Sequence, residues 1–395
     1  MTLRRVDKPK VALLIETSGG YGRSFLAGVA RYARLHGPWS FYILPRGHEQ
    51  VLPDMKQWGG TGIIARVRSR KVAAAIAAAE VPAIGLDLAP EVVASMPPGF
   101  RPSEIHPDSQ AIARLAAEHL FERGFAHFAF VGVRNRIWSQ ERHQAFSEYL
   151  LRTRGYACTV FTLSEVTRTA RFSQDQQRLG AWLKQQPKPL GLMSCNDDCG
   201  REVLDAALQV GLSVPDEMAV VGVDNDEVLC ELCDPPLSSV ALNAEKGGYE
   251  AASLLDSLMA GRSKKARRLV VQPLGVVARR STEVWAVADR NIARALQFIR
   301  DHAHEPIGVS DVLRLVPMSR RALEVRFRQV ARRSIHDEII AARLRLAQKL
   351  LRETDLTLEA MAERCGFGSA SHMSVVFARE VGLAPAQYRK RVRST

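Results

Sequence analysis

The sequence predicts a two-lobed α/β domain over residues 8–285, followed by an all-α domain with two helix-turn-helix motifs over residues 289–395. Two observations predict this division. Short apolar runs alternate with helical stretches in the N-terminal region, which is typical of parallel sheets covered by helices on both faces. In the C-terminal region, the same helix-pair pattern occurs twice, with Leu323 and Met373 at matching positions 50 residues apart.

Strands are predicted where the N-terminal region has short apolar runs, at 11–15, 41–44, 62–65, 83–86, 127–133, 158–163, 190–194 and 218–223. Helices are expected between them, for example at 23–35, 110–122, 140–152 and 197–210. This region is longer than a single sheet usually needs, so two doubly wound lobes are expected. Ligands of such folds bind beyond the carboxyl ends of the strands.

In the C-terminal region, each copy of the repeat has two amphipathic helices joined by a short turn, at 316–318 and at 365–368. Ser319 and Ser369 stand where a hydroxyl can accept from the free N–H groups of the second helix, as an N-cap does. Two helices joined by so short a turn must cross steeply, which is the geometry of a helix-turn-helix. Two such motifs in tandem predict a clamp for double-stranded DNA.

Charge supports the DNA interpretation. Residues 289–395 contain 20 Lys and Arg against 12 Asp and Glu, a net charge of +8 out of +13 for the whole chain. A basic domain has the electrostatic character of a phosphate-binding surface. A charged face that is merely solvated is the alternative, and it is the repeat that favours DNA.

Residues 289–395 resemble the two-motif DNA-binding domain of the AraC family. The segments that carry the resemblance are ARLRLAQKLL at 342–351, AERCGF at 362–367, Phe377, and GLAPAQYR at 382–389. The resemblance implies seven helices, with the second helix of each pair entering the major groove. A connecting helix over 335–351 would be roughly 25 Å long. That length is of the order of one DNA turn, so successive major grooves could be read from one face.

Helix phase predicts the DNA-facing side chains. Because Leu323, Phe327, Met373 and Phe377 point to the core, the opposite faces carry Arg320, Arg321, Glu324 and Arg328 in the first motif and Ala370, Ser371, His372, Ser374 and Val375 in the second. Arg321 is the best candidate for reading guanine, and Glu324 could accept from cytosine. Phosphate contacts are expected from Arg320, Arg328, Arg332 and Arg333. For each of these residues a solvated surface role is the alternative.

Residues 8–285 resemble the sugar-sensing domain of the LacI family, which is itself similar to periplasmic binding proteins. Four short segments carry the likeness, at 22–29, 141–146, 195–197 and 220–225, and an expected strand over 269–280 followed by Ser281 and Thr282 matches the exit of that domain. The LacI family has its helix-turn-helix before the sensor. Here the DNA-binding domain follows the sensor, an arrangement that resembles the xylose operon regulators.

The resemblance implies a sugar site. Arg142, Asn196 and Asp224 match motif positions that contact sugars in the LacI family, and they suit hydroxyl groups, since Arg donates, Asp accepts and the Asn amide does both. Asp197 is an equal choice between sugar ligand and helix cap. Weaker candidates, each of which could be purely structural, are Asp87, Trp138 as a stacking surface, Tyr21 and Arg23.

Other classes of protein are less favoured. The six cysteines are interpreted as structural thiols, because neither Cys195 with Cys199 nor Cys230 with Cys233 has the partners of a zinc site. No metal and no cofactor are expected. Asp108 precedes a helix and is expected to cap it. The glycines at 19–22 lack a phosphate-loop lysine. A sugar or nucleotide enzyme with a basic tail is the alternative from another class.

The N-terminal residues are polar and basic, and no apolar run approaches the length of a membrane span, so a cytoplasmic protein without membrane association is expected. The sequence therefore predicts a sugar-responsive transcription regulator that binds DNA and a pentose, with D-xylose favoured by the resemblance. A homodimer is expected, and RNA polymerase would be a partner of an activator. The alternatives are a sensor of another sugar or a purine, and a constitutive DNA-binding protein whose first domain only dimerises.

Overall fold

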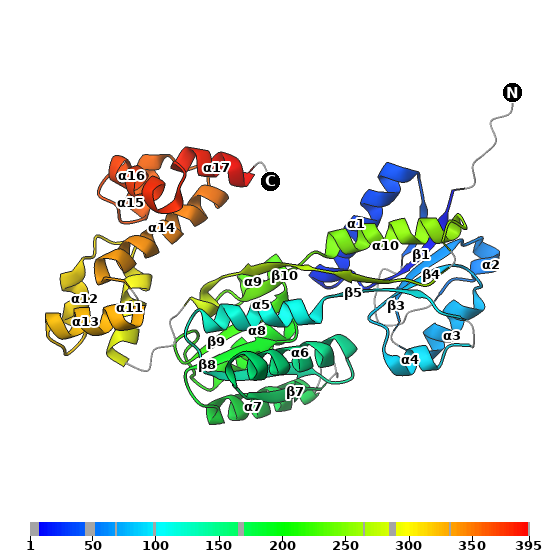
Figure 1. Cartoon of the computed structure of the whole chain (residues 1–395), viewed down its shortest axis with the longest axis horizontal. Helices are drawn as coiled ribbons and strands as arrows, with labels where there is room; N and C mark the ends of the chain where they lie inside the picture. Colours follow the sequence, from blue (N-terminus) through cyan, green and yellow to red (C-terminus); the bar gives the residue numbers. More distant parts are fainter. Residues whose placement is uncertain are drawn as a thin grey trace. The chain divides into compact units, whose positions relative to one another are not determined.

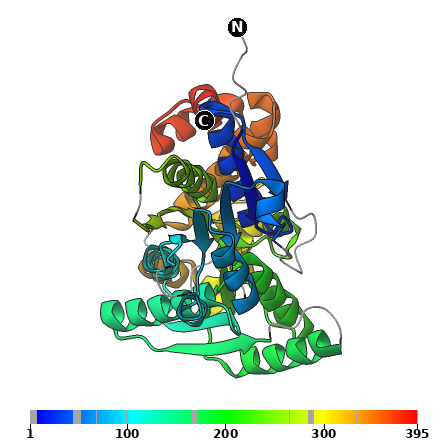
Figure 2. The same ribbon diagram turned by 90° about the vertical axis from the view of Figure 1, so that its right-hand side faces the viewer.

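The computed structural model describes residues 8–43, 52–67, 69–97, 100–164, 170–263, 265–283, 290–331 and 333–393. The chain forms two compact units, unit 1 over Met1–Glu283 and unit 2 over Val284–Thr395. Unit 1 contains two sheets with helices on their faces, and unit 2 is helical (Figures 1 and 2). No helix in the described ranges has the length and apolar character that crossing a membrane requires.

Lobe 1 of unit 1 is a six-stranded parallel sheet in the order β11-β5-β4-β3-β1-β2. Its strands are β1 (Lys10–Leu14), β2 (Ser40–Ile43), β3 (Gly62–Arg66), β4 (Ala83–Leu86), β5 (Ser103–Pro107) and β11 (Arg268–Val271). Its helices are α1 (Gly20–His36), α2 (Met55–Trp58), α3 (Arg70–Ala78), α4 (Pro90–Ala94) and α10 (Ala244–Met259). Alternate residues of β1 enter two cores, Val11 and Leu13 on the α1 and α10 side, Ala12 and Leu14 on the other.

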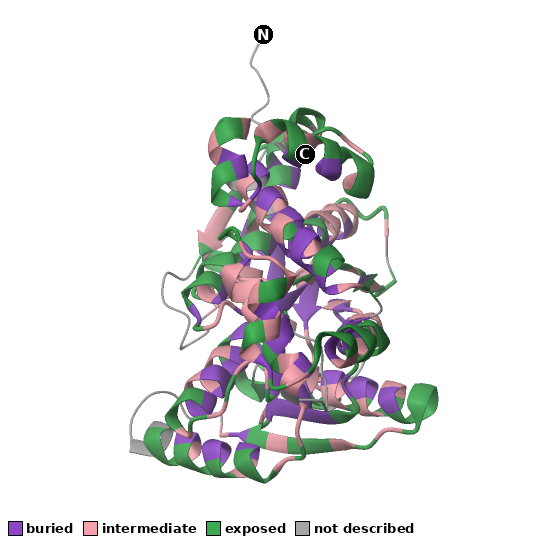
Figure 3. Cartoon of the chain, turned by 90° about the vertical axis from the view of Figure 1, so that its left-hand side faces the viewer, coloured by how far each residue is buried: buried purple, intermediate pink, exposed green. Residues whose placement is uncertain are grey.

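Lobe 2 is a six-stranded sheet in the order β12-β10-β9-β8-β6-β7, parallel except for β12. Its strands are β6 (His127–Val133), β7 (Cys158–Leu163), β8 (Leu190–Ser194), β9 (Met218–Asp224), β10 (Ser238–Leu242) and β12 (Pro273–Val277). Its helices are α5 (Ser109–Phe121), α6 (Ile137–Arg154), α7 (Ala170–Gln185), α8 (Asp197–Gln209) and α9 (Glu227–Leu232), and η1 (Arg280–Thr282) ends the unit. Its inner strands β6, β8, β9 and β10 form the buried centre, whereas the edge strands β7 and β12 are largely exposed or half-buried (Figure 3).

The expected strand over 269–280 is wrong as a single element. It is divided at Gln272 into β11, which pairs with β5 in lobe 1, and β12, which pairs with β10 in lobe 2. Pro273 has no N–H to continue a ladder, which favours a change of sheet at this position. The pattern also missed β5 and β10, because SEIHP and SSVAL are rich in polar residues and lack a continuous apolar run.

The chain passes between the lobes at three single-residue connections, Asp108, Asn243 and Gln272. Two of them are linked to each other. The Asp108 N–H donates to Val271 O over 2.9 Å, and Gln272 Nε2 donates to Asp108 Oδ2 over 2.9 Å. Asp108 also accepts from the Ala111 N–H, so its expected role as a helix cap is confirmed. These hydrogen bonds tie two of the three connections together.

Unit 2 has seven helices within the described residues, as the resemblance implied: α11 (Arg290–His302), α12 (Val309–Leu315), α13 (Arg320–Ala331), α14 (Ile335–Glu353), α15 (Leu358–Arg364), α16 (Ala370–Val381) and α17 (Pro385–Arg393). Leu323 and Phe327 are fully buried in one core, Met373 and Phe377 in a second. The hydroxyls of Ser319 and Ser369 accept from Ala322 and His372 N–H groups, so both expected caps are confirmed. Helix α14 spans both cores.

Helices α1 and α10 pack backbone to backbone in lobe 1. A Cβ placed on Gly248 would lie 1.8 Å from Phe25 O, and one on Gly28 would lie 1.9 Å from Glu245 O. Both contacts are with backbone atoms of the opposite helix, which cannot rotate away as a side chain does. Glycine is therefore required at both positions for this helix separation.

We expect Gly248→Ala to destabilise unit 1 by about 2 kcal/mol or more, because the added methyl group forces the two helices apart. Urea unfolding followed by circular dichroism measures the change. Gly19→Ala is the matched control, since a Cβ at Gly19 meets nothing within 4 Å. Equal stability of the two variants would contradict the packing argument.

Candidate functional site

Four side chains of lobe 1 gather beyond the carboxyl ends of its strands. Arg66, at the end of β3, forms ion pairs with Glu16, which follows β1, and with Asp87, which follows β4; its Nε lies 3.1 Å from Asp87 Oδ2. The Arg66 guanidinium also lies over the ring of Tyr21, with 5.2 Å between Cζ and the ring centroid. The parallel sheet brings these residues together because its strands all end at one edge.

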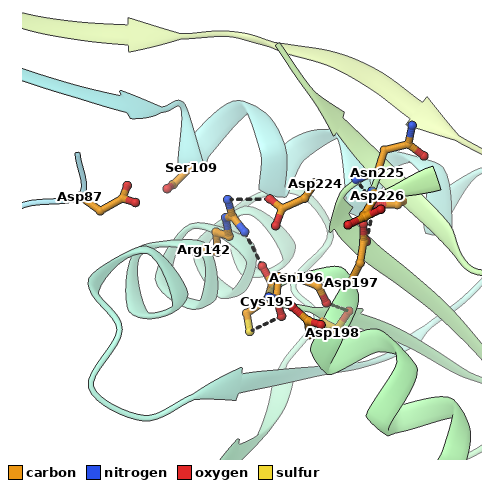
Figure 4. Close-up of polar contacts among 12 residues, drawn as sticks. Asp87, Ser109, Arg142, Cys195, Asn196, Asp197, Asp198, Asp224, Asn225 and Asp226 are labelled. Carbon is orange, nitrogen blue, oxygen red and sulfur yellow. Dashed lines mark hydrogen bonds and ion pairs between the residues drawn. The ribbon is translucent and has the colours of Figure 1, made fainter. Parts of the chain in front are cut away.

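A second arginine–carboxylate group lies in lobe 2. Arg142, on the second turn of α6, is 4% exposed, donates to the Cys195 carbonyl, and forms an ion pair with Asp224 over 3.6 Å (Figure 4). Its Cζ lies 5.2 Å from the centroid of the Trp138 ring. Within the described residues, its buried Nε has no hydrogen-bond partner. This arrangement holds the guanidinium in a fixed orientation at the end of the lobe 2 strands.

The two groups influence each other electrostatically. Burial raises the pKa of Asp224 to about 6, while Arg142 of its own lobe and Arg66 of lobe 1 oppose that rise. Burial also raises the pKa of Tyr21, and Asp87 and Asp224 raise it further. Figure 4 shows Asp87 and Ser109 facing the region where Arg142 and Asp224 meet. Polar groups from both lobes therefore converge between the sheets.

The loop that carries Asp224 is held in an unusual conformation. Asp224 and Asn225 have φ values of +110° and +52°, a region that residues other than glycine rarely adopt. The Asp197 carboxylate stabilises the loop, because it accepts from the Ser239 hydroxyl over 2.6 Å and from the Asp226 N–H over 2.8 Å. Burial, with Asp224 nearby, raises the pKa of Asp197 to about 8.

The capping alternative for Asp197 is wrong. The N-cap of α8 is Asn196, whose side-chain oxygen accepts from the Cys199 N–H over 3.1 Å. Asp197 is the first residue of the helix and its carboxylate is used by the 224–226 loop. The Asn196 amide also donates to Asp198 over 3.3 Å. The protein itself therefore occupies much of the hydrogen-bonding capacity of both side chains.

Arg23 lies at the contact between the lobes. Its guanidinium, on α1 of lobe 1, forms an ion pair with Asp226 of lobe 2 over 3.0 Å and donates to the carbonyls of Thr17 and Ser18. The structure thus joins Arg23 to the same loop that carries Asp224.

Sequence reasoning missed Glu16 and Arg66, which complete the lobe 1 group. The available signal was their position, since each is a charged residue at or just after the end of an apolar strand. Ser109 was also missed. Its hydroxyl donates to Glu141 over 3.3 Å, beside the Asp108 connection.

The second candidate surface is on unit 2. The four predicted side chains of α13, Arg320, Arg321, Glu324 and Arg328, are all exposed, and Arg320 and Glu324 form an ion pair with each other over 2.9 Å. Arg333 pairs with Glu338 over 3.4 Å. Arg332 lies outside the described residues.

On α16, Ser371, His372 and Val375 are exposed. Ser374 and Ala370 are half-buried, and Ala370 also packs against the second core. Val325, which the sequence analysis missed, is 51% exposed on α13 and matches Val375, 68% exposed, in the repeat. Each second helix thus presents one exposed valine among polar groups.

The six cysteines are free thiols, and Cys195 Sγ lies 3.3 Å from Cys199 Sγ in the buried start of α8. Among the described residues, no group of three or more His, Cys, Asp or Glu side chains has the arrangement of a metal site.

Comparisons with known proteins agree with both units. Residues 117–282 match the family model of a periplasmic binding protein-like domain, and residues 313–391 match that of a helix-turn-helix domain. The xylose operon regulatory protein of Escherichia coli strain K12 is 31% identical over 384 residues, which cover 96% of each chain. That of Haemophilus influenzae strain KW20 is 30% identical and covers 96% of this chain and 98% of its own.

A solved structure extends the likeness to the fold of the whole chain. The structure of the xylose-binding transcription activator xylR superposes with a TM-score of 0.75 at 30% identity, covering 98% of both chains. The order of the domains, a periplasmic binding protein-like unit before a double helix-turn-helix unit, is common to the sequence, the fold and these relatives. The chain therefore belongs to the family of xylose operon regulatory proteins.

Proposed function

We propose that this protein is a transcription regulator that binds a pentose, D-xylose, between the lobes of unit 1 and double-stranded DNA through α13 and α16 of unit 2. The observation that carries the sugar site is the pair of arginine–carboxylate groups, one on each lobe. The relatives, named as xylose regulators, support the choice of sugar. Because those relatives are regulators, we also propose that the protein is not an enzyme.

The charges of the site favour a neutral ligand. Arg66 and Arg142 are opposed by three carboxylates, those of Glu16, Asp87 and Asp224. A phosphorylated sugar would add negative charge where carboxylates already outnumber guanidinium groups. A neutral monosaccharide instead supplies hydroxyls that donate to the carboxylates and accept from the guanidinium groups. This balance supports a sugar over a sugar phosphate.

We assign the sugar contacts to Arg142 and Asp224 of lobe 2 and to Asp87, Arg66, Glu16 and Tyr21 of lobe 1. Trp138 supports the Arg142 guanidinium and is assigned as a stacking surface for the sugar ring. The other three candidates have mainly structural roles. Asn196 caps α8, Asp197 holds the 224–226 loop, and Arg23 joins the two lobes through Asp226. A sugar that contacts both groups stabilises the closed arrangement of the lobes, since it binds that state best.

The sugar signal would reach DNA through a homodimer, in which a change in unit 1 alters how two copies of unit 2 engage their sites. If the protein activates transcription, RNA polymerase is the further partner. Arg321 remains the proposed base reader, because its side chain is exposed on α13. The neighbouring Glu324 forms its ion pair with Arg320 and not with Arg321. The phosphate contacts are assigned to Arg328, Arg332 and Arg333, with Arg320.

The proposal is tested by thermal unfolding of the full chain with a panel of monosaccharides and sugar phosphates. We expect D-xylose at a hundred times its dissociation constant to stabilise the protein by about 2.7 kcal/mol. Xylose phosphate should have no effect. A panel without any stabilising sugar would remove the sugar from the proposed function, and turnover of sugar with ATP or NAD would establish an enzyme instead.

Asp224→Ala should abolish the xylose-induced shift while DNA binding in the absence of sugar stays unchanged, because the carboxylate is the lobe 2 acceptor. Asp205→Ala is the matched control, since Asp205 lies on α8 of the same lobe and pairs with Arg201 away from the site. A normal xylose response in the Asp224 variant would refute the site.

Xylose affinity should fall as the pH is lowered below about 6. Burial raises the pKa of Asp224 to about 6, and the protonated carboxyl loses an acceptor for sugar hydroxyls. The loss should approach about tenfold per pH unit below the pKa, as one proton must be released on binding. Calorimetric titrations between pH 5 and pH 8 measure the slope, which Asp224→Asn should remove. An unchanged affinity at pH 5 would contradict a charged Asp224 as the acceptor.

Arg321→Ala should weaken binding to the protein's specific DNA site, chosen from a random library, more than binding to random DNA. The difference should be about 1–3 kcal/mol, since a base contact is lost. Arg328→Ala should weaken both equally and reduce the salt dependence, since a phosphate contact is lost. Electrophoretic mobility shifts at several salt concentrations separate these outcomes. Equal losses on both DNAs for both variants would end this division of roles.

A further inference from the structure

Arg343 lies where the two cores of unit 2 meet. It is in the middle of α14, the helix that runs from the first helix-turn-helix motif to the second (Figure 1). Ile339 and Ala342 belong to the first core, whereas Ile340 and Leu344 belong to the second. Arg343 is thus the polar residue between two apolar clusters, and it is not among the residues assigned to DNA.

The Arg343 guanidinium contacts the loop that leads into the first motif and the turn of the second motif. Its Nε donates to Ala303 O over 3.1 Å, and its Nη2 donates to Glu305 O over 3.0 Å and to Ile307 O over 3.1 Å. These carbonyls belong to the loop between α11 and α12, which leads into the first motif. The Cζ of Arg343 lies 5.9 Å from the centroid of the Phe367 ring, in the turn of the second motif.

The second motif also touches this loop directly at Gly366. This residue has a φ of +69°, and a Cβ placed on it would lie 2.5 Å from Ala303 O and 2.8 Å from Glu305 O. The turn of the second motif therefore packs against the same loop that Arg343 binds. Glycine permits both the backbone conformation and the close approach.

A connecting helix alone would hold the motifs loosely, because long helices bend at small cost. The Arg343 contacts add a second connection across the joint between the motifs. A planar guanidinium with donors in a fixed fork can bind several carbonyls at once, which a lysine ammonium cannot do with the same geometry. Loss of Arg343 would remove the donor from three loop carbonyls. Helix α14 would then be the main connection between the two motifs.

We propose that Arg343 is a positioning residue that fixes the spacing and phase of α13 relative to α16, and thereby the separation of the two DNA half-sites that the protein accepts. The inference rests on the proposed DNA-binding function of unit 2. It adds that specificity for half-site spacing depends on a residue that does not contact DNA.

The test uses the full chain and DNA selected from a random library. Selected sites that contain two half-sites are rebuilt with one base pair inserted or removed between them, and each half-site is also prepared alone. We expect the unmodified protein to lose at least about tenfold in affinity for each altered spacing, a loss like that of a mismatched base pair. Arg343→Ala should lose less than about threefold, with unchanged affinity for a single half-site.

Arg345→Ala is the matched control, because Arg345 lies on the same helix and pairs with Glu338 instead; it should discriminate as the unmodified protein does. Arg343→Lys keeps the charge and provides a second variant if Arg343→Ala does not fold; it too should accept altered spacings. Full discrimination by Arg343→Lys or Arg343→Ala, or an equal loss on single half-sites, would overturn the inference. An unmodified protein that selects no DNA would instead refute the proposed function of unit 2.

Discussion

The candidate site of unit 1 depends on the hydrogen bonds that the buried Asp197 carboxylate accepts. The carboxylate binds the Ser239 hydroxyl and the Asp226 N–H, and so holds the loop in which Asp224 and Asn225 adopt positive φ values. That loop carries Asp224, the partner of Arg142, and Asp226, the partner of Arg23 from the other lobe. Strain of this kind persists only where the surrounding structure fixes it, and it is concentrated at functional sites.

Both arginines of the site are also fixed in advance. Arg66 is held by Glu16 and Asp87, and Arg142 by the Cys195 carbonyl, Asp224 and the Trp138 ring. A guanidinium that is already oriented loses little conformational freedom when a ligand binds. The pairing also neutralises the positive charge. A site of this kind suits a ligand with many hydroxyls and no charge, which fits the sugar named for the relatives.

Unit 2 applies the same principle of fixed geometry to its two motifs. Each motif has its own core, and α14 contributes alternate residues to both. The loop after α11 and the turn before α16 meet at Gly366 and Arg343. The hydrogen bonds from Arg343 to backbone carbonyls are directional, whereas apolar contacts have no preferred direction. Helix α14 sets the distance between the two motifs. The contacts of Arg343 and Gly366 are a second restraint, which acts on the orientation of one motif relative to the other.

The sequence by itself determined the two units, most strands of unit 1, and the two helix pairs of unit 2 with the buried positions of α13 and α16, because these follow from local periodicity and from the repeat. The seven helices of unit 2 were implied by the resemblance to the AraC family. Tertiary structure decided the rest. The division of 269–280 between two sheets depends on pairing with β5 and β10, which local pattern does not contain. Arg66 joins Glu16 and Asp87 only because parallel strands end together, and Asp197 serves the 224–226 loop rather than a helix cap because β9 and β10 bring Ser239 and Asp226 to it.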